Sequence, residues 1–341
     1  MDRNADLHLL SEPENERIFD QRIRSRLFAE ARPSSLPVAI IFGGQPGAGK
    51  SAALAAAMLE MESRGGAVEI IGDDLRAMHP SFKRLMAADD QSAAFYTDRD
   101  AGRWVEKAIS YAKDHRYNVV IEGTFRSSDV VANTMRQFRE AGYEIDARAL
   151  AVNERFSRQG IIERYEAQRA ARGSGRMTMP HSHQAAYDGM PLTIERIERE
   201  QLVDRLALYR RGNEVIYTNQ VKNGRWENPP RAVEALQQER ARPWSEHERT
   251  AFLDAADRIE AMLLAEGRHA TQKEIAAAVQ LRSAIEPAST ELAKEQSGLV
   301  DPLSRYPEIV AARARVAARD LQRSRSPKGP GKGFGLEGFG E

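Results

Sequence analysis

One eight-residue segment combines the residue types and spacing that hold phosphate. Gly44-Gln45-Pro46-Gly47-Ala48-Gly49-Lys50-Ser51 fits the pattern G-x-x-x-x-G-K-[ST] in full. Its glycines let phosphate oxygens approach the main chain, whose N–H groups can point inward around an anion. Lys50 can reach the β and γ oxygens of a nucleoside triphosphate, and the Ser51 hydroxyl can ligate Mg²⁺. The segment therefore predicts a nucleotide site with a divalent cation.

The flanking sequence supports a phosphate loop rather than a glycine-rich turn that matches by chance. An apolar run at 38–42 precedes the segment and predicts a strand. The run from Ser51 to about Arg64 is rich in Ala, Leu and Met, which are strong helix formers. A strand, a loop and a helix in this order place the helix dipole at the phosphate.

Short apolar strands alternate with helical patterns along the chain. Strands are expected at 38–42, 68–71, 118–121, 147–152 and 214–217. This alternation predicts an α/β fold with a parallel sheet and helices on both faces, as in P-loop kinases. Ligands collect at the carboxyl ends of such strands, which directs attention to Gly72-Asp73-Asp74 and Glu122-Gly123-Thr124-Phe125-Arg126. The second segment departs from a usual Walker B element and favours a small-molecule kinase.

Several of these segments together resemble the zeta toxin family. The phosphate loop, 72–80 and 120–130 are similar to successive signatures of that family, and 96–102 and 162–166 support them in order. The resemblance extends from about residue 15 to about residue 235. It implies a kinase that uses ATP and Mg²⁺ to phosphorylate UDP-N-acetylglucosamine on a sugar hydroxyl. Such an enzyme is a bacterial toxin, held inactive by an antitoxin.

The resemblance also implies roles for individual residues. Asp73 matches the catalytic base, six residues before His79. Arg164 matches an arginine on the transferring phosphate, and Arg176 is the expected second one, with Arg172 as the alternative. The positions that line the sugar-nucleotide site are Glu106, Glu122, Thr124 and Arg126.

Phosphoryl transfer fits these residue types. It needs a carboxylate near the acceptor hydroxyl and cations around the γ-phosphate, which Asp73, Lys50, Arg164 and Arg176 would supply. Structural alternatives remain for several of them. Asp73, and Asp74 more so, can be simple helix caps, while Glu122 can act on Mg²⁺ through water. Glu106 can be an ordinary glutamate on a solvated helix surface, and Arg169 and Arg172 can be ordinary solvated charges. His79, His181 and His183 are not expected to form a zinc site.

Composition further limits the classes of protein to which this chain can belong. The 341 residues contain 50 basic and 50 acidic residues and no cysteine, which excludes disulfides and thiol chemistry. No signal peptide or membrane span is expected, so the default location is the cytoplasm. Three parts are expected: a kinase domain at 1–240, a helical appendage at 241–310 and a basic, flexible tail at 311–341.

The appendage and tail leave a second class of function open. Capping boxes at 245–248 and 271–274 predict two helices, and 309–322 predicts a third. The tail carries seven Lys or Arg against the single acid Asp320 between residues 311 and 332. Such a tail can be merely solvated, or it can contact nucleic acid, another protein or a secretion system. The alternatives to the sugar-nucleotide kinase are a kinase for another small hydroxylated acceptor and an ATP-switched interaction protein.

Overall fold

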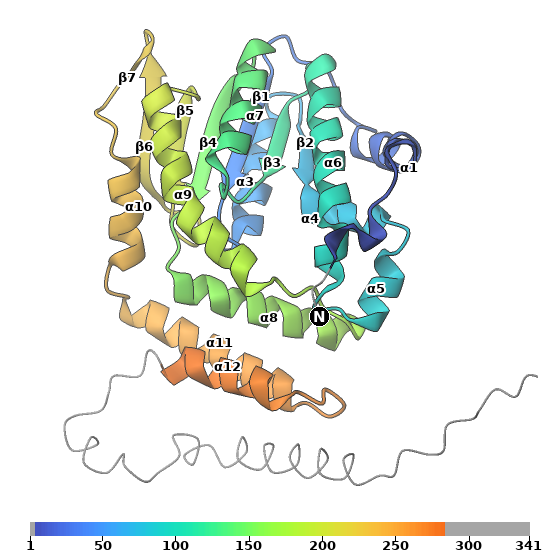
Figure 1. Cartoon of the computed structure of the whole chain (residues 1–341). Helices are drawn as coiled ribbons and strands as arrows, with labels where there is room; N and C mark the ends of the chain where they lie inside the picture. The colour runs from blue at the N-terminus through green and yellow to red at the C-terminus, as the bar shows by residue number, and fades with distance from the viewer. Residues whose placement is uncertain (1–3, 284–341) are drawn as a thin grey trace, which may run out of the picture. The chain divides into compact units, whose positions relative to one another are not determined.

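The computed structural model describes residues 4–283, and its centre is a seven-stranded sheet (Figure 1). The strands lie in the order β2-β3-β1-β4-β5-β6-β7. Neighbouring strands among the first five are parallel, whereas β6 and β7 pair antiparallel. The strands are β1 Val38–Gly43, β2 Val68–Ile71, β3 Val119–Glu122, β4 Glu144–Leu150, β5 Arg205–Tyr209, β6 Val215–Lys222 and β7 Arg225–Trp226. The expected α/β fold with a largely parallel sheet is confirmed.

The end of the sheet formed by β5, β6 and β7 differs from the expectation in two ways. Strand β5 was not predicted, and the predicted strand at 214–217 runs antiparallel to it as part of β6. The connection between β5 and β6 is a short turn at 210–214. A parallel pair needs a crossover of a dozen or more residues, so a turn of this length forces the antiparallel arrangement.

Helices cover both faces of the sheet. Helix α3 packs on one face, and α6, α7 and α9 pack on the other (Figure 1). The helices of the sheet-bearing part are α1 Glu12–Ile18, α2 Ser25–Leu27, α3 Lys50–Glu62, α4 Gly72–Leu75, α5 Phe82–Ala88, α6 Ala93–Asp114, α7 Ser128–Glu140, α8 Glu154–Arg172, α9 Pro180–Glu200 and α10 Ala232–Ala241. Short 3₁₀ turns at Ala5–His8 and Arg76–Met78 and a π-helical stretch at Phe19–Arg24 complete this set.

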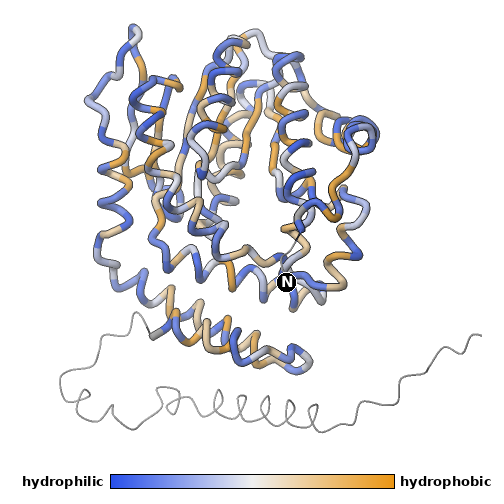
Figure 2. Tube along the Cα trace, in the orientation of Figure 1, coloured by the Kyte–Doolittle hydropathy of each residue, from blue (hydrophilic) through white to orange (hydrophobic). Residues whose placement is uncertain are grey.

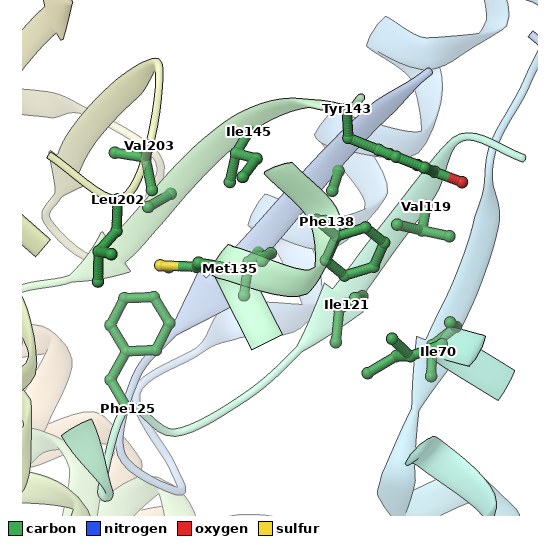
Figure 3. Packing of buried hydrophobic residues seen from close by; sticks show 14 of the residues in the cluster. Ile70, Val119, Ile121, Phe125, Met135, Phe138, Tyr143, Ile145, Leu202 and Val203 are labelled. Carbon is green, nitrogen blue, oxygen red and sulfur yellow. The ribbon is translucent and has the colours of Figure 1, made fainter. Parts of the chain in front are cut away.

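The larger core lies between the sheet and α7 (Figure 3). Met135 and Phe138 of α7 are fully buried with Val119 and Ile121 of β3 and Ile145 of β4. Burial of a side chain of this size contributes about 1.5 to 3 kcal/mol. Figure 2 shows the apolar residues along the strands and polar residues on the outer turns of the helices. This packing holds the carboxyl ends of β1 and β3, where the expected site lies, at fixed positions.

Contacts divide the chain into two compact units, one up to Ala255 and one from Ala256. Helix α11, Glu246–Leu264, begins with the expected capping box, since Ser245 Oγ accepts from the Glu248 N–H at 3.2 Å. The second unit contains the end of α11 and α12, Gln272–Ser283. Its buried residues include Ile259 and Leu263 from α11 with Ile275 and Ala278 from α12. The helix expected at 309–322 and the basic tail lie outside the described residues.

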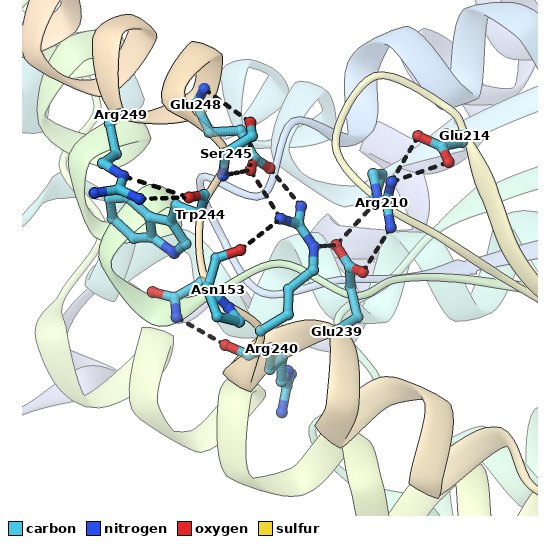
Figure 4. A network of polar contacts seen from close by, with 11 residues as sticks. Asn153, Arg210, Glu214, Glu239, Arg240, Trp244, Ser245, Glu248 and Arg249 are labelled. Atoms are coloured by element: carbon cyan, nitrogen blue, oxygen red, sulfur yellow. Dashed lines mark hydrogen bonds and ion pairs between the residues drawn. The ribbon is translucent and has the colours of Figure 1, made fainter.

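Residues 241–255 are tied to the sheet-bearing unit by a chain of ion pairs (Figure 4). Arg210 contacts Glu239 at 2.9 Å, and Arg242 contacts Glu239 at 2.8 Å and Glu248 at 2.8 Å. The hydrogen bonds from Arg242 lower the pKa of Glu248 to about 2. The boundary expected at residue 240 stays a prediction. Among helices within residues 4–283, none has both the length and the apolar character needed to cross a bilayer.

Candidate active site

The phosphate loop packs directly against α8, which crosses the carboxyl end of the sheet (Figure 1). Gly47 has φ +79°, and a Cβ there would lie 1.9 Å from the Ser157 carbonyl oxygen. Gly160 faces it from α8, where a Cβ would lie 2.6 Å from the Gly47 oxygen. No side chain fits at either position. Main chain therefore touches main chain, and the loop and α8 hold one another in place.

Two side chains of the loop, those of Gln45 and Ala48, are buried in the protein. Gln45 is fully buried and donates from Nε2 to the Val152 carbonyl at 2.8 Å and to Ser157 Oγ at 3.2 Å. Ala48 is also fully buried. Gly49 adopts φ +90° directly before α3, and no side chain of the described chain caps the first turn of that helix. The loop thus fits a phosphate through its main chain and its helix N-terminus.

Lys50 lies at the centre of the site. Its Nζ donates to the Gly44 carbonyl at 2.7 Å and lies 3.3 Å from Glu122 Oε1 at the end of β3. Burial lowers the pKa of Lys50, and the Glu122 carboxylate offsets part of this effect. The charge of Asp73 raises the pKa of Lys50 and that of Arg164 lowers it, both as smaller effects than burial. Ser51 is exposed at the first turn of α3, where its hydroxyl is free to meet a cation.

Asp73 stands in the first turn of α4, directly after β2. Ile71 is the N-cap of this helix, and the Asp73 carboxylate makes ion pairs instead. It lies 3.0 Å from Arg76 Nε and 2.7 Å from Arg176 Nη2. Burial acts to raise the pKa of Asp73, but the two arginines, Arg176 first, outweigh it and hold the pKa below its ordinary value. Asp73 is therefore a carboxylate at neutral pH, placed between two guanidinium groups.

The two expected phosphate arginines come from α8 and the segment after it. Arg164 donates from Nη2 to Thr178 Oγ1 at 2.9 Å, and its buried Nε has no hydrogen-bond partner within residues 4–283. Burial, followed by the charge of Arg176, lowers the pKa of Arg164. Arg176 points back to Asp73, whereas Arg172 is exposed at the last turn of α8. The geometry thus favours Arg176 over Arg172 as the second arginine.

Residues 123–126 form a tightly held turn after β3. The Gly123 N–H donates to the Phe42 carbonyl at 2.9 Å, and Phe125 is buried with φ +56°. A Cβ on Gly43 would lie 2.3 Å from the Phe125 ring, and one on Gly189 would lie 2.2 Å from the Arg126 carbonyl oxygen. These close approaches fix where the turn presents Thr124 and Arg126.

The expected sugar-nucleotide residues occupy different surroundings. Glu122 is half-buried beside Lys50, and Thr124 is half-buried in the turn after β3. Arg126 is exposed, with Nη2 4.0 Å from Asp98 Oδ2, and Asp98 also accepts from Arg76 at 2.6 Å. Glu106 is exposed on α6. The structure therefore brings Glu122 into direct contact with the lysine, while it leaves Glu106 and Arg126 at the surface.

A cleft of about 870 Å³ opens beside Asp73. Its walls include Asp73, Asp74 and Arg176, together with Ile23 and Leu27 from the N-terminal helices. Glu106, Glu122, Thr124 and Arg126 do not line it. No local sequence pattern indicates the N-terminal wall, because its residues lie about fifty positions before Asp73. Arg76 could have been found, since its spacing of three residues places it beside Asp73 on a helix.

Comparisons with known proteins show which proteins the chain resembles. The chain is 33% identical over 184 residues to Toxin zeta of Enterococcus hirae, covering 54% of this chain and 64% of that protein, so it spans slightly less than two thirds of that relative. It is 28% identical over 233 residues to Toxin PezT of Streptococcus pneumoniae serotype 4, covering 68% of this chain and 89% of that protein.

A solved structure has the same fold. It is described as the PezAT chromosomal toxin-antitoxin system of Streptococcus pneumoniae, and it matches with a TM-score of 0.63 and 25% identity over 75% of this chain and 99% of that one. The zeta toxin family model matches residues 22–222, which include the phosphate loop, Asp73 and both arginines. On these grounds the chain belongs to the zeta toxin family.

Proposed function

We propose that this protein is an ATP-dependent kinase that phosphorylates a sugar hydroxyl of UDP-N-acetylglucosamine. The observation that carries the proposal is that Lys50 lies beside Glu122 at the end of β3 and the Asp73–Arg176 ion pair lies just after the neighbouring strand β2, with Arg164 on α8. Three cations and one carboxylate are the groups that transfer of a phosphoryl group to an alcohol requires.

Each residue has a distinct task in this reaction. The main chain of residues 44–51 holds the phosphates of ATP, and Lys50 reaches their β and γ oxygens. Arg164 and Arg176 compensate the charge on the transferring group. The low pKa of Asp73 makes it a weak base, so it orients the acceptor hydroxyl and takes the proton late in a loose transition state.

The residues present also fit Mg²⁺. The exposed Ser51 hydroxyl would hold the cation, and Glu122 beside Lys50 would act on it through water. When bound, Mg²⁺ supplies positive charge to the β and γ oxygens.

The choice of acceptor and partner rests on family membership. The segment Glu122-Gly123-Thr124-Phe125-Arg126 and Glu106 match family positions for the sugar nucleotide. The related PezT protein belongs to a system described as toxin and antitoxin. We therefore propose that this protein is a cytoplasmic toxin that a partner antitoxin inhibits.

The test is a direct search for the product. The protein is incubated with ATP, Mg²⁺ and UDP-N-acetylglucosamine, and mass spectrometry looks for a sugar nucleotide heavier by one phosphate. Lys50→Ala should abolish the product because it removes a transition-state cation. Lys222→Ala is the matched control, because Lys222 is exposed on β6. Product formation by Lys50→Ala at the rate of the control would contradict the kinase proposal.

A further inference from the structure

Asp90 is a buried carboxylate with no part in the chemistry described above. It lies in the connection between α5 and α6 and is 7% exposed. Its Oδ1 accepts from the Tyr165 hydroxyl at 2.9 Å, and its Oδ2 accepts from Arg169 Nη1 at 2.7 Å and from the Gly175 N–H at 3.0 Å. Gly175 is 85 positions away in the sequence. One carboxylate thus binds the last turns of α8 and the segment that follows the helix.

The segment held by Asp90 leads directly to Arg176. A Cβ on Gly175 would lie 2.3 Å from the Tyr165 carbonyl oxygen, so the main chain is pressed against α8 at this point. The next N–H, that of Arg176, donates to Gln168 Oε1 at 2.8 Å. Burial raises the pKa of Tyr165, and the Asp90 contact adds to this effect, so the phenol keeps the proton that it donates. Two consecutive amides are therefore fixed immediately before the Arg176 side chain begins.

We infer that Asp90 is a positioning residue, which sets the place of Arg176 by anchoring Gly175 to the end of α8. The inference rests on the proposed function, in which Arg176 acts on the transferring phosphate. A glycine segment has more main-chain freedom than any other, so a guanidinium that follows one needs an anchor to be placed accurately. Misplacement of a catalytic group by about 1 Å can lower the rate about 100-fold.

Asp90→Asn keeps the size of the side chain but removes its charge and one of its acceptor oxygens. We expect kcat for acceptor phosphorylation to fall about 10- to 100-fold while KM for ATP changes little, because Lys50 and the phosphate loop are untouched. Tyr165→Phe, which deletes one donor and keeps the ring, should give the same pattern with a smaller loss. Asp89→Asn is the matched control. It removes the neighbouring charge, which accepts from the Gln91 N–H and the Ser92 hydroxyl ahead of α6, and it should leave kcat unchanged.

A double-mutant cycle separates positioning from general stabilisation. If Asp90 acts through Arg176, then Asp90→Asn adds no further loss in an Arg176→Ala background. An equal loss of kcat in both backgrounds would overturn the inference and leave the proposed function standing. Full kcat in Arg176→Ala alone would overturn both the inference and the proposed role of Arg176.

Hydrogen exchange tests the anchor without any substrate. The Gly175 N–H is bonded to Asp90, so peptides that span 173–178 should exchange faster in Asp90→Asn and unchanged in Asp89→Asn. Unchanged exchange in both variants would show that Asp90 does not hold this segment and would refute the inference, whichever acceptor the enzyme uses.

Discussion

Gly47→Ala should disable the phosphate loop through two separate effects. The left-handed φ of +79° costs a residue with a Cβ about 1 to 2 kcal/mol. The added methyl would also lie 1.9 Å from the Ser157 carbonyl oxygen, which main chain cannot avoid by changing rotamer. Overpacking of this kind costs about 1 to 3 kcal/mol. The sum is roughly 2 to 5 kcal/mol, and a shift of the loop away from α8 is the only relief.

Two other glycines separate these effects. Gly65 has φ +92°, and apart from its chain neighbours no atom of the described part of the chain lies within 4 Å of an added Cβ, so Gly65→Ala carries the backbone cost alone. Gly160 lies inside α8, where Ala is a better helix former by about 1 kcal/mol, so Gly160→Ala carries only the 2.6 Å contact with the Gly47 oxygen.

Titration with a fluorescent ATP analogue and urea unfolding measure the two consequences. We expect Gly47→Ala and Gly160→Ala to weaken ATP binding at least about tenfold, which corresponds to 1.4 kcal/mol. Gly65→Ala should lower stability and leave ATP binding unchanged. Normal ATP affinity in Gly47→Ala, or an equal loss of affinity in Gly65→Ala, would refute the argument that contact with α8 shapes the loop.

Three further predictions concern the acceptor side and the C-terminal packing. Asp73→Asn should keep ATP binding but lower acceptor phosphorylation by at least about 100-fold, measured by product formation; near-normal turnover would reduce Asp73 to a structural residue. Because Arg176 lowers the pKa of Asp73, Arg176→Ala should raise that pKa and move the acid limb of kcat/KM to higher pH, and an unmoved limb would contradict the pairing. Phe252 is fully buried, with its ring 5.4 Å from Phe156 and 5.2 Å from Trp244. Phe252→Ala should therefore lower the free energy of unfolding, measured in urea, by about 3 to 5 kcal/mol. A loss below about 1 kcal/mol would show that residues 241–255 do not pack against Phe156 as a stabilising cluster.

The parts of the fold that depend on local sequence could be predicted. The phosphate loop, the strands β1 and β2 and both capping boxes each lie within a short window of residue types. Strand β5 could not be found in this way, because Arg205-Leu206-Ala207-Leu208-Tyr209 contains no β-branched residue and Leu and Ala fit a helix equally well. Its place between β4 and β6 comes from the sheet.

The sequence supplies candidate site residues one by one, but it does not show the contacts between them. Motif spacing indicated Lys50, and the resemblance to the zeta toxin family indicated Asp73 and Arg164. The choice between Arg172 and Arg176 depended on how the chain turns after α8. Gly173 ends that helix with φ +76°, and the anchored segment beyond it returns Arg176 to Asp73. Asp90 and Asp98 were missed because their partners are distant in sequence, and no local pattern marks a buried carboxylate of this kind.

Helix α8 is fastened at two points along its length, and this constrains how the gene can change. Gly160 meets the phosphate loop, and Tyr165 and Arg169 meet Asp90. One inserted residue turns the rest of a helix by about 100° and shifts it by about 1.5 Å. An insertion or deletion between Gly160 and Tyr165 could therefore keep the contact with the phosphate loop or the contact with Asp90, but not both. Substitutions can accumulate on the outer side of α8, but the number of residues between Gly160 and Tyr165 is fixed.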